Sequence, residues 1–333
     1  MRRIAVIGAG SWGTAAAWLA SSNAEVILWS RRAEVADAIN QTRENARYLP
    51  GRDLPETLIA THDLRAAVDG ADLIVIAVPS HGFRDVFREM AGVLPRTVPL
   101  LSLTKGIEQN SLSRMTEIIA QVDEDHDLTR VGVLTGPNLA SEIAAEQPTA
   151  AVVAMRDGAT AIEVQSVFMS PLFRVYTNDD VVGCELGGAL KNVMAIAAGM
   201  SDGLGFGDNT RATLITRALA ELTRLGVQLG GKPSTFAGLA GMGDLIATCV
   251  SHRSRNHQVG FGLATGKSLD EISAEMDMVA EGVKTTRAVL DLAQTADVEM
   301  PIASQVGQVL YEGVDPRQAM LTLMTREAKP EYL

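Results

Sequence analysis

The sequence predicts an α/β protein whose first half is a doubly wound sheet and whose second half is an all-helical C-terminal domain. The chain has 333 residues, which exceeds the size at which one hydrophobic core usually divides into two. Short apolar runs alternate with helix-length segments in the first half, whereas β-branched runs are scarce after residue 178. The expected domains are therefore residues 1–178 and 179–333.

The apolar runs of the first half are expected to be strands with helices on both sheet faces, because such strands are continuously hydrophobic rather than alternating. In chain order they cover residues 4–7, 25–29, 73–78, 98–102, 131–134 and 150–154. Segments with helical length follow at 83–92 and 112–122. The second half contains longer helical patterns, such as 186–200 and 213–225, separated by glycine-containing breaks. We expect the two domains to pack closely and to form a ligand cleft at their junction.

Composition excludes several classes of function. The formal net charge is -11, which opposes non-specific binding of nucleic acid. The two cysteines, Cys184 and Cys249, form neither a disulfide framework nor a metal-ligand pattern, so we expect no metal. An uncharged stretch after Arg2 and Arg3 has the alternative interpretation of a secretory signal or membrane anchor, but glycines interrupt its apolar core. We expect the protein to be cytoplasmic and not inserted in a membrane.

A glycine motif follows the first expected strand. Gly8, Gly10 and Gly13 have the GxGxxG spacing of a Rossmann-type dinucleotide-binding turn. Gly8 allows the tight turn, Gly10 lets the backbone approach a pyrophosphate, and Gly13 lets the next helix pack on the strand. The alternative is a glycine-rich turn in a related domain that binds another ligand.

The end of the second expected strand indicates which dinucleotide binds. Arg31 and Arg32 stand where an NAD site usually has an acidic residue, and Glu34 comes only later. Guanidinium groups suit a 2′-phosphate, so NADP(H) is favoured over NAD(H). The alternative is that one or both arginines are solvated at the surface and bind no phosphate.

Three basic features of the sequence suit a small phosphorylated substrate. Lys191 lies in an apolar segment rich in small residues, and burial of an ammonium is one way in which a lysine becomes a general base. A lysine that reaches along its helix to solvent is the alternative. Lys105 follows an expected strand, at the edge where open α/β sheets bind ligands. The run 252–257 is rich in donors, including Arg253 and Arg255.

Together these segments closely resemble the bacterial NAD(P)-dependent glycerol-3-phosphate dehydrogenase family, over essentially the whole chain. The matching motifs lie at residues 8–13, 78–81, 104–106, 136–140, 187–193, 199–207, 241–245, 254–256 and 279–282. The resemblance implies reversible oxidation of sn-glycerol 3-phosphate to dihydroxyacetone phosphate with NADP(H), and also NAD(H). It further implies production of glycerol 3-phosphate for phospholipid synthesis. We also expect a homodimer, although the sequence does not give the oligomeric state.

The same resemblance assigns roles to individual residues. It makes Lys191 the proton acceptor for the C2 hydroxyl, with Asp244 beside it as the second catalytic residue. It places along the substrate Lys105, Gly136, Asn138, Lys191, Asp244, Ser254, Arg255 and Asn256. It places along the cofactor Ser11, Trp12, Arg31, Arg32, Tyr48, Lys105, Ala140, Arg255, Val279 and Glu281.

Two positions depart from the family pattern. Asn138 stands where the family usually has Ser or Thr, so its contact with the substrate is open. The turn at 22–25 is one residue shorter, which leaves open whether Arg31 or Arg32 meets the 2′-phosphate.

Two other functions remain to be separated by experiment. One is a β-hydroxyacid dehydrogenase acting on a carboxylate substrate, and the other is a non-catalytic dinucleotide sensor.

Overall fold

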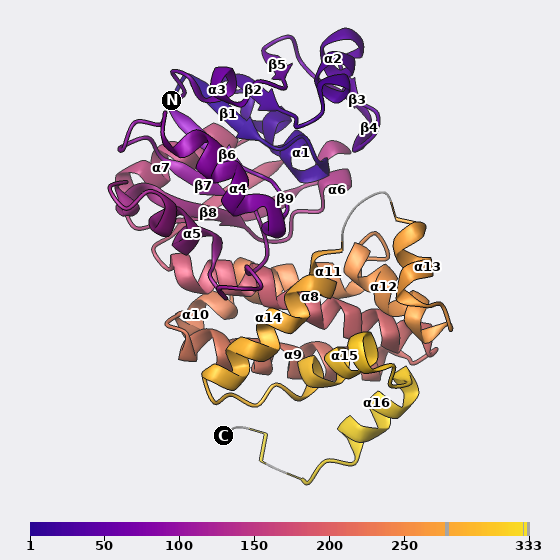
Figure 1. The fold of residues 1–333 in the computed structure, drawn as a ribbon. Coiled ribbons are helices and arrows are strands. Elements are labelled where there is room, and N and C mark those ends of the chain that lie inside the picture. Colours follow the sequence, from indigo (N-terminus) through magenta and orange to yellow (C-terminus); the bar gives the residue numbers. More distant parts are fainter. Residues whose placement is uncertain (277–279, 329, 332–333) are drawn as a thin grey trace.

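A computed structural model of the protein consists of an α/β half above a helical half (Figure 1). The structure describes residues 1–276, 280–328 and 330–331. The fold class expected from the sequence is confirmed. β10 ends at Asn178 and α8 begins at Val181, so we keep 1–178 and 179–333 as the proposed division into domains.

An eight-stranded sheet forms the centre of the upper half, in the order β10-β9-β8-β7-β6-β1-β2-β5. Its strands are β1 (Arg3–Ile7), β2 (Glu25–Trp29), β5 (Leu58–Thr61), β6 (Leu73–Ile76), β7 (Leu100–Ser102), β8 (Val131–Thr135), β9 (Thr149–Met155) and β10 (Phe173–Asn178). All neighbouring pairs are parallel except β8 and β9. A separate antiparallel pair is formed by β3 (Glu44–Asn45) and β4 (Leu49–Asp53).

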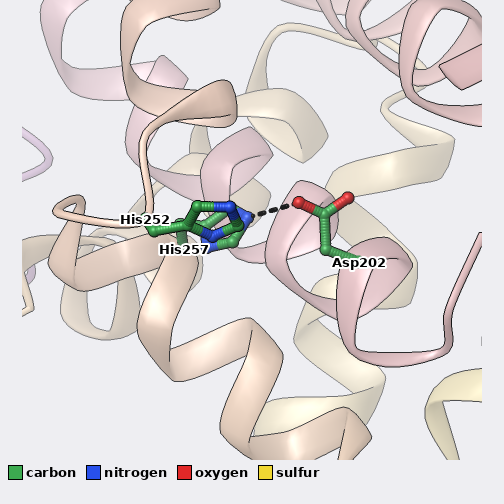
Figure 2. Close-up of side chains that lie close together, drawn as sticks. All are labelled: Asp202, His252 and His257. Atoms are coloured by element: carbon green, nitrogen blue, oxygen red, sulfur yellow. Dashed lines mark hydrogen bonds and ion pairs between the residues drawn. The ribbon is translucent and has the colours of Figure 1, made fainter. Parts of the chain in front are cut away.

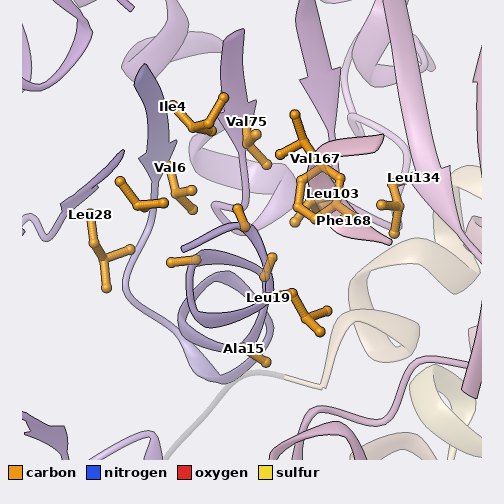
Figure 3. Packing of buried hydrophobic residues seen from close by; sticks show 14 of the residues in the cluster. Ile4, Val6, Ala15, Leu19, Leu28, Val75, Leu103, Leu134, Val167 and Phe168 are labelled. Atoms are coloured by element: carbon orange, nitrogen blue, oxygen red, sulfur yellow. The ribbon is translucent and has the colours of Figure 1, made fainter. Parts of the chain in front are cut away.

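Helices cover both faces of this sheet because successive side chains of each strand point to opposite faces. Ile4 and Val6 of β1 belong to one core, which Figure 3 shows with Leu19 of α1 and Phe168 of α7. Ala5 and Ile7 belong to the core on the other face. The helices of this half are α1 (Ser11–Ala20), α2 (Ala33–Thr42), α3 (Leu64–Val68), α4 (Ser80–Ala91), α5 (Met115–Val122), α6 (Ala140–Ala144) and α7 (Gly158–Phe168), with a 3₁₀ turn at Leu128–Arg130.

The helical half is built around α8 (Val181–Gly203), whose side chains are buried over most of its length. Around it lie α9 (Asp208–Gln228), α10 (Pro233–Phe236), a π-helical turn (Leu239–Gly243), α11 (Asp244–Val250), α12 (Arg255–Ala264), α13 (Leu269–Ala274), α14 (Glu281–Thr295), α15 (Pro301–Glu312) and α16 (Pro316–Met324). By length and composition α8 passes the test for a membrane span, but 89% of its most apolar window is buried inside the protein. Such burial is typical of a core helix.

Two details of the sheet were not expected. β5 and β10 are additional strands at its two edges, and β9 runs antiparallel to β8. A parallel return needs a crossover that travels back along the sheet, usually a helix. The helix between these strands, α6, has five residues and spans only about 8 Å, so the chain turns back on itself instead.

The order of the strands fixes where a ligand can bind. The chain proceeds from β1 outward to β2 and β5, then crosses to β6 on the other side of β1. Ligands of open α/β sheets bind at the carboxyl ends of the strands where this order reverses. Here that edge faces the helical half, and α8, α11 and α12 lie beneath it.

Candidate functional site

A cavity of about 960 Å³ lies between the carboxyl edge of the sheet and the helical half. The glycine turn after β1 and the segment after β7 line it from above. Lys191 of α8, Thr248 of α11 and the residues that begin α12 line it from below. The expected interdomain cleft is therefore present, and residues that are far apart in the sequence meet in it.

The glycine turn has the geometry that its spacing predicts. Gly8 has φ +121°, and a Cβ there would lie 2.6 Å from the carbonyl oxygen of Ala77. A Cβ at Gly13 would lie 1.9 Å from the carbonyl oxygen of Gly8, so α1 packs directly on the turn. A Cβ at Gly10 would have no atom of the described residues within 4 Å. Gly10 thus borders open space at the start of α1, where amides of a first helical turn attract an anion.

Two buried donors in this cavity indicate that a polar ligand belongs there. Trp12 Nε1 and Asn138 Nδ2 are buried and have no hydrogen-bond partner within the described residues. Both residues line the cavity. A buried donor without a partner is costly, so a ligand that supplies acceptors is favoured. Together with the open turn at Gly10, these residues fit a dinucleotide.

The basic end of the cavity is formed by Arg31, Arg32 and Tyr48, which all line it. The guanidinium carbon of Arg32 lies 5.6 Å from the centre of the Tyr48 ring. Its Nε is 4.0 Å from the carboxylate of Glu34, which is 72% exposed. The backbone oxygen of Tyr48 accepts a 2.5 Å hydrogen bond from Ser11 Oγ, which ties this residue to the glycine turn. Positive charge therefore stands at the end of β2.

Two lysines and one aspartate form the floor of the cavity. Lys191 donates to Oδ1 of Asp244, and Lys105 Nζ lies 2.7 Å from Oδ2 of the same carboxylate. The Asp244 side chain is only 2% exposed, and it lies behind the two lysines rather than on the lining. Lys191 does not reach bulk solvent along its helix, since its side chain is 7% exposed. Of the two interpretations of Lys191 drawn from the sequence, burial is the one observed.

Lys105 links the floor to the adjoining loop. Its Nζ also donates to the backbone oxygen of Gly136 at 3.1 Å and to Oδ1 of Asn138 at 2.5 Å. The pKa of Lys105 is lowered to about 7, chiefly by burial and also by the neighbouring Lys191, while the Asp244 carboxylate partly offsets both effects. Lys105 therefore changes charge near neutral pH, unlike an ordinary surface lysine.

Two residues beside the lysines were missed in the sequence. Thr248 Oγ1 accepts a 2.6 Å hydrogen bond from Lys191 and donates to the backbone oxygen of Asp244. Asn192 Nδ2 donates to the backbone oxygen of Lys105 at 3.1 Å. Thr248 lies one helical turn after Asp244, and Asn192 follows Lys191, so spacing from the assigned residues could have identified both.

The start of α12 brings a guanidinium to the cavity. Arg255 is solvent-accessible but surrounded by the cleft walls, and this desolvation lowers its guanidinium pKa while Glu281 opposes the change. Ser254 caps the helix by accepting from the His257 amide at 3.3 Å. Asn256 donates to Asn192 Oδ1 at 3.0 Å. Arg253 lines the mouth, but its side chain is 61% exposed and 3.9 Å from Glu142.

The remaining assigned positions lie around this centre. Glu281, at the start of α14, accepts a 2.5 Å hydrogen bond from Ser80 Oγ and thereby joins the two halves of the protein. Ala140, at the start of α6, lines the cavity. Among the described residues, the lining does not include Gly136, which reaches the site through its carbonyl oxygen. Val279 lies outside the described residues.

Comparison with known proteins identifies related sequences over both halves. Residues 3–161 match the family model for the NAD-dependent glycerol-3-phosphate dehydrogenase N-terminus, and residues 180–321 match that for its C-terminus. A protein of Sphingopyxis alaskensis named glycerol-3-phosphate dehydrogenase [NAD(P)+] 2 is 55% identical over 92% of this chain and 91% of its own. One of Streptomyces coelicolor named glycerol-3-phosphate dehydrogenase [NAD(P)+] is 52% identical over 99% and 98%.

Solved structures agree with these sequence matches. The crystal structure of glycerol-3-phosphate dehydrogenase from Coxiella burnetii superposes with a TM-score of 0.92 at 40% identity, covering 98% of this chain and 99% of that one. A ketopantoate reductase from Ralstonia eutropha superposes with a TM-score of 0.57 at 16% identity, covering 96% and 99%. The latter similarity extends to the fold alone.

Proposed function

The chain belongs to the NAD-dependent glycerol-3-phosphate dehydrogenase family, and from this premise we propose how its own residues carry out the reaction. It is an oxidoreductase that uses NAD(P)(H) and oxidises glycerol 3-phosphate. In the balanced reaction, sn-glycerol 3-phosphate and NAD(P)⁺ give dihydroxyacetone phosphate, NAD(P)H and a proton. The bound nicotinamide supplies the acceptor for the hydride that leaves C2. The proposal depends above all on the contact of Lys191 with Asp244 at the floor of the cleft.

Lys191 moves the proton. In oxidation its neutral amine takes the proton of the C2 hydroxyl, and in reduction its ammonium returns that proton to the ketone oxygen. An ammonium has three hydrogens; two of those of Lys191 are directed to Asp244 and Thr248. The third is available to a substrate oxygen in the cavity that Lys191 lines. Asp244 and Thr248 thus hold the amine in one orientation.

The positive groups around this centre bind the substrate. Lys105 lies beside Lys191 on the shared carboxylate and attracts the phosphorylated substrate when it is protonated. Arg255 enters the same cavity from α12 and meets the phosphate with charge-assisted hydrogen bonds. Asn138 offers Nδ2, which has no partner in the described part of the chain, as a further donor. The overall charge of -11 makes such local donors necessary.

Arg31 and Arg32 set a preference for NADP(H) over NAD(H). Both line the end of the cavity, whereas Glu34, whose carboxylate is 4.0 Å from Arg32, is 72% exposed and does not line it among the described residues. A phosphate fits this charge better than a hydroxyl, which needs an acceptor.

In the cell, we place the enzyme in the cytoplasm, acting as a homodimer in the direction of reduction. Its product, glycerol 3-phosphate, then provides the backbone for phospholipid synthesis. The support for this role is the family membership, together with the two cysteines, which are both free and buried, as is usual for proteins of a reducing compartment.

One assay tests the proposed function. The purified chain is mixed with NADPH or NADH, and loss of the reduced nicotinamide absorbance is followed after addition of dihydroxyacetone phosphate. We expect turnover with both cofactors and a higher kcat/KM with NADPH. A 3-oxo carboxylate without phosphate, the kind of compound that a β-hydroxyacid dehydrogenase reduces, serves as the control. Turnover of the carboxylate in place of the phosphate ester would overturn the substrate assignment, and absence of any turnover would favour a dinucleotide sensor.

A further inference from the structure

Three side chains with metal-ligand chemistry meet outside the cleft. Asp202 lies near the end of α8, His252 lies between α11 and α12, and His257 lies on α12. One ligand atom from each lies within 4.8 Å of the other two. His257 Nε2 is 2.8 Å from Asp202 Oδ2, and the two imidazole rings are 5.1 Å apart between centres (Figure 2).

We propose that Asp202, His252 and His257 bind a divalent transition-metal ion such as Zn²⁺. Neutral imidazole nitrogens and a carboxylate oxygen are the ligands that zinc accepts at about 2.0–2.2 Å, and three protein ligands leave a fourth position for water. The two ligand atoms that are now hydrogen-bonded need to separate only slightly for an ion to bridge them. His252, whose ring lies beside that of His257 in Figure 2, completes the set.

The charge around the cluster favours a cation. Arg211 pairs with Asp202 at 3.0 Å, and it pairs with Asp208 at 2.9 Å as well. With neutral imidazoles, the two carboxylates and one guanidinium leave a net charge of -1. Arg211 occupies Oδ1 of Asp202, whereas Oδ2 faces the imidazoles. A hydrogen bond from the surrounding protein to the free oxygen of a metal-binding carboxylate is a usual way of orienting it.

Two of the three proposed ligands are buried, and the third is accessible to solvent. The side chains of Asp202 and His257 are 7% and 1% exposed, so packing holds them in place. His252 is exposed and, with His257, lines a separate cavity of about 420 Å³ that opens to solvent. A metal ion can enter by this route. The proposal is independent of the proposed enzyme function.

Isothermal titration of the tag-free protein with Zn²⁺ tests the proposal. We expect one ion bound per chain, and we expect His252→Ala to weaken binding at least about 10-fold, since even partners outside the coordination sphere change affinity by 10–100-fold. His252 is exposed, so this variant should fold, and thermal unfolding checks that it does. His62→Ala removes an exposed histidine directly after β5, an edge strand of the α/β half, and serves as the matched control.

A second titration with Co²⁺ gives a spectroscopic signature. A tetrahedral site produces visible absorption bands, which should appear with the unsubstituted protein and His62→Ala and be lost with His252→Ala. Absence of saturable binding below millimolar metal, or equal affinity in His252→Ala and His62→Ala, would overturn the proposal.

Discussion

Lys105 and Lys191 are held by the same carboxylate: Lys105 Nζ is 2.7 Å from Oδ2 of Asp244, and Lys191 donates to Oδ1. One negative charge therefore serves two ammonium groups, which leaves the floor of the cleft net positive when both are protonated. This arrangement places a proton-transfer group and a substrate-binding charge at a fixed separation. It also makes the charge of one lysine depend on that of the other.

The first prediction concerns pH. Burial lowers the pKa of Lys105 from 10.5 to about 7, so the free enzyme loses this positive charge as the pH rises through that value. The kcat/KM for dihydroxyacetone phosphate should therefore fall between about pH 7 and about pH 9, since kcat/KM reports groups of the free enzyme. Lys105→Gln should have lower activity and lack this alkaline limb. A limb of unchanged midpoint in Lys105→Gln would assign it to another group.

The second prediction concerns the choice of cofactor. The double variant Arg31→Ala/Arg32→Ala should raise the KM for NADPH by about 10- to 150-fold, the worth of a charge-assisted hydrogen bond, and change that for NADH much less. Arg47→Ala is the matched control, because Arg47 also lies 5.6 Å from the Tyr48 ring but does not line the cavity. An equal loss for both cofactors would show that these arginines do not read the 2′-phosphate.

The third prediction separates two neighbouring arginines. Arg255→Ala should raise the KM for dihydroxyacetone phosphate by at least about 10- to 150-fold, because a phosphate would lose a charged partner inside the cleft. Arg253→Ala should leave it nearly unchanged, because that side chain is 61% exposed and faces Glu142. Steady-state kinetics with each variant decide the matter. The same small change in both would place the phosphate elsewhere.

The fourth prediction uses two glycines of one turn. Gly10→Ala should keep the free energy of unfolding, since its Cβ would meet no described atom within 4 Å, yet weaken NADPH binding by occupying the space next to the turn. Gly13→Ala should destabilise the fold by about 1–3 kcal/mol, because its Cβ would lie 1.9 Å from the Gly8 oxygen. Denaturant unfolding and NADPH titration measure the two effects. Unchanged NADPH affinity in Gly10→Ala would argue against a dinucleotide at this turn.

Much of the α/β half could be predicted because its signals are local. The apolar run 25–29 has the same first and last residues as β2. The glycine spacing at 8–13 predicts the tight turn between β1 and α1 that the structure contains. The direction of β9 could not be predicted, since an apolar run has no polarity of its own. β5, with the sequence Leu-Ile-Ala-Thr, is too short and too mixed to stand out.

A site residue could be predicted where its own segment contains both a reactive side chain and a recognisable structural pattern around it. Lys191, in its apolar helix, is such a case. Thr248 was missed because its role depends on the side chain of Lys191, which is 57 residues away in the chain. Asp202 and His252 are likewise far apart in the chain, because α9, α10 and α11 lie between them. Only the packing of α12 against α8 brings them together.

Lys191 is proposed to transfer the proton of the reaction, and Lys191→Ala tests this role. Asp244 keeps Lys105 as a partner in this variant, so the fold should persist, and thermal unfolding verifies this. Lys232→Ala, which removes a half-exposed lysine paired with Asp179, is the control for loss of a positive charge in the helical half.

The decisive measurement is kcat for dihydroxyacetone phosphate-dependent oxidation of NADPH at saturating cofactor. We expect Lys191→Ala to lower kcat by about 10²–10⁴, the range for a positioned proton-transfer group, with NADPH affinity little changed. Turnover of Lys191→Ala close to that of Lys232→Ala would contradict this role.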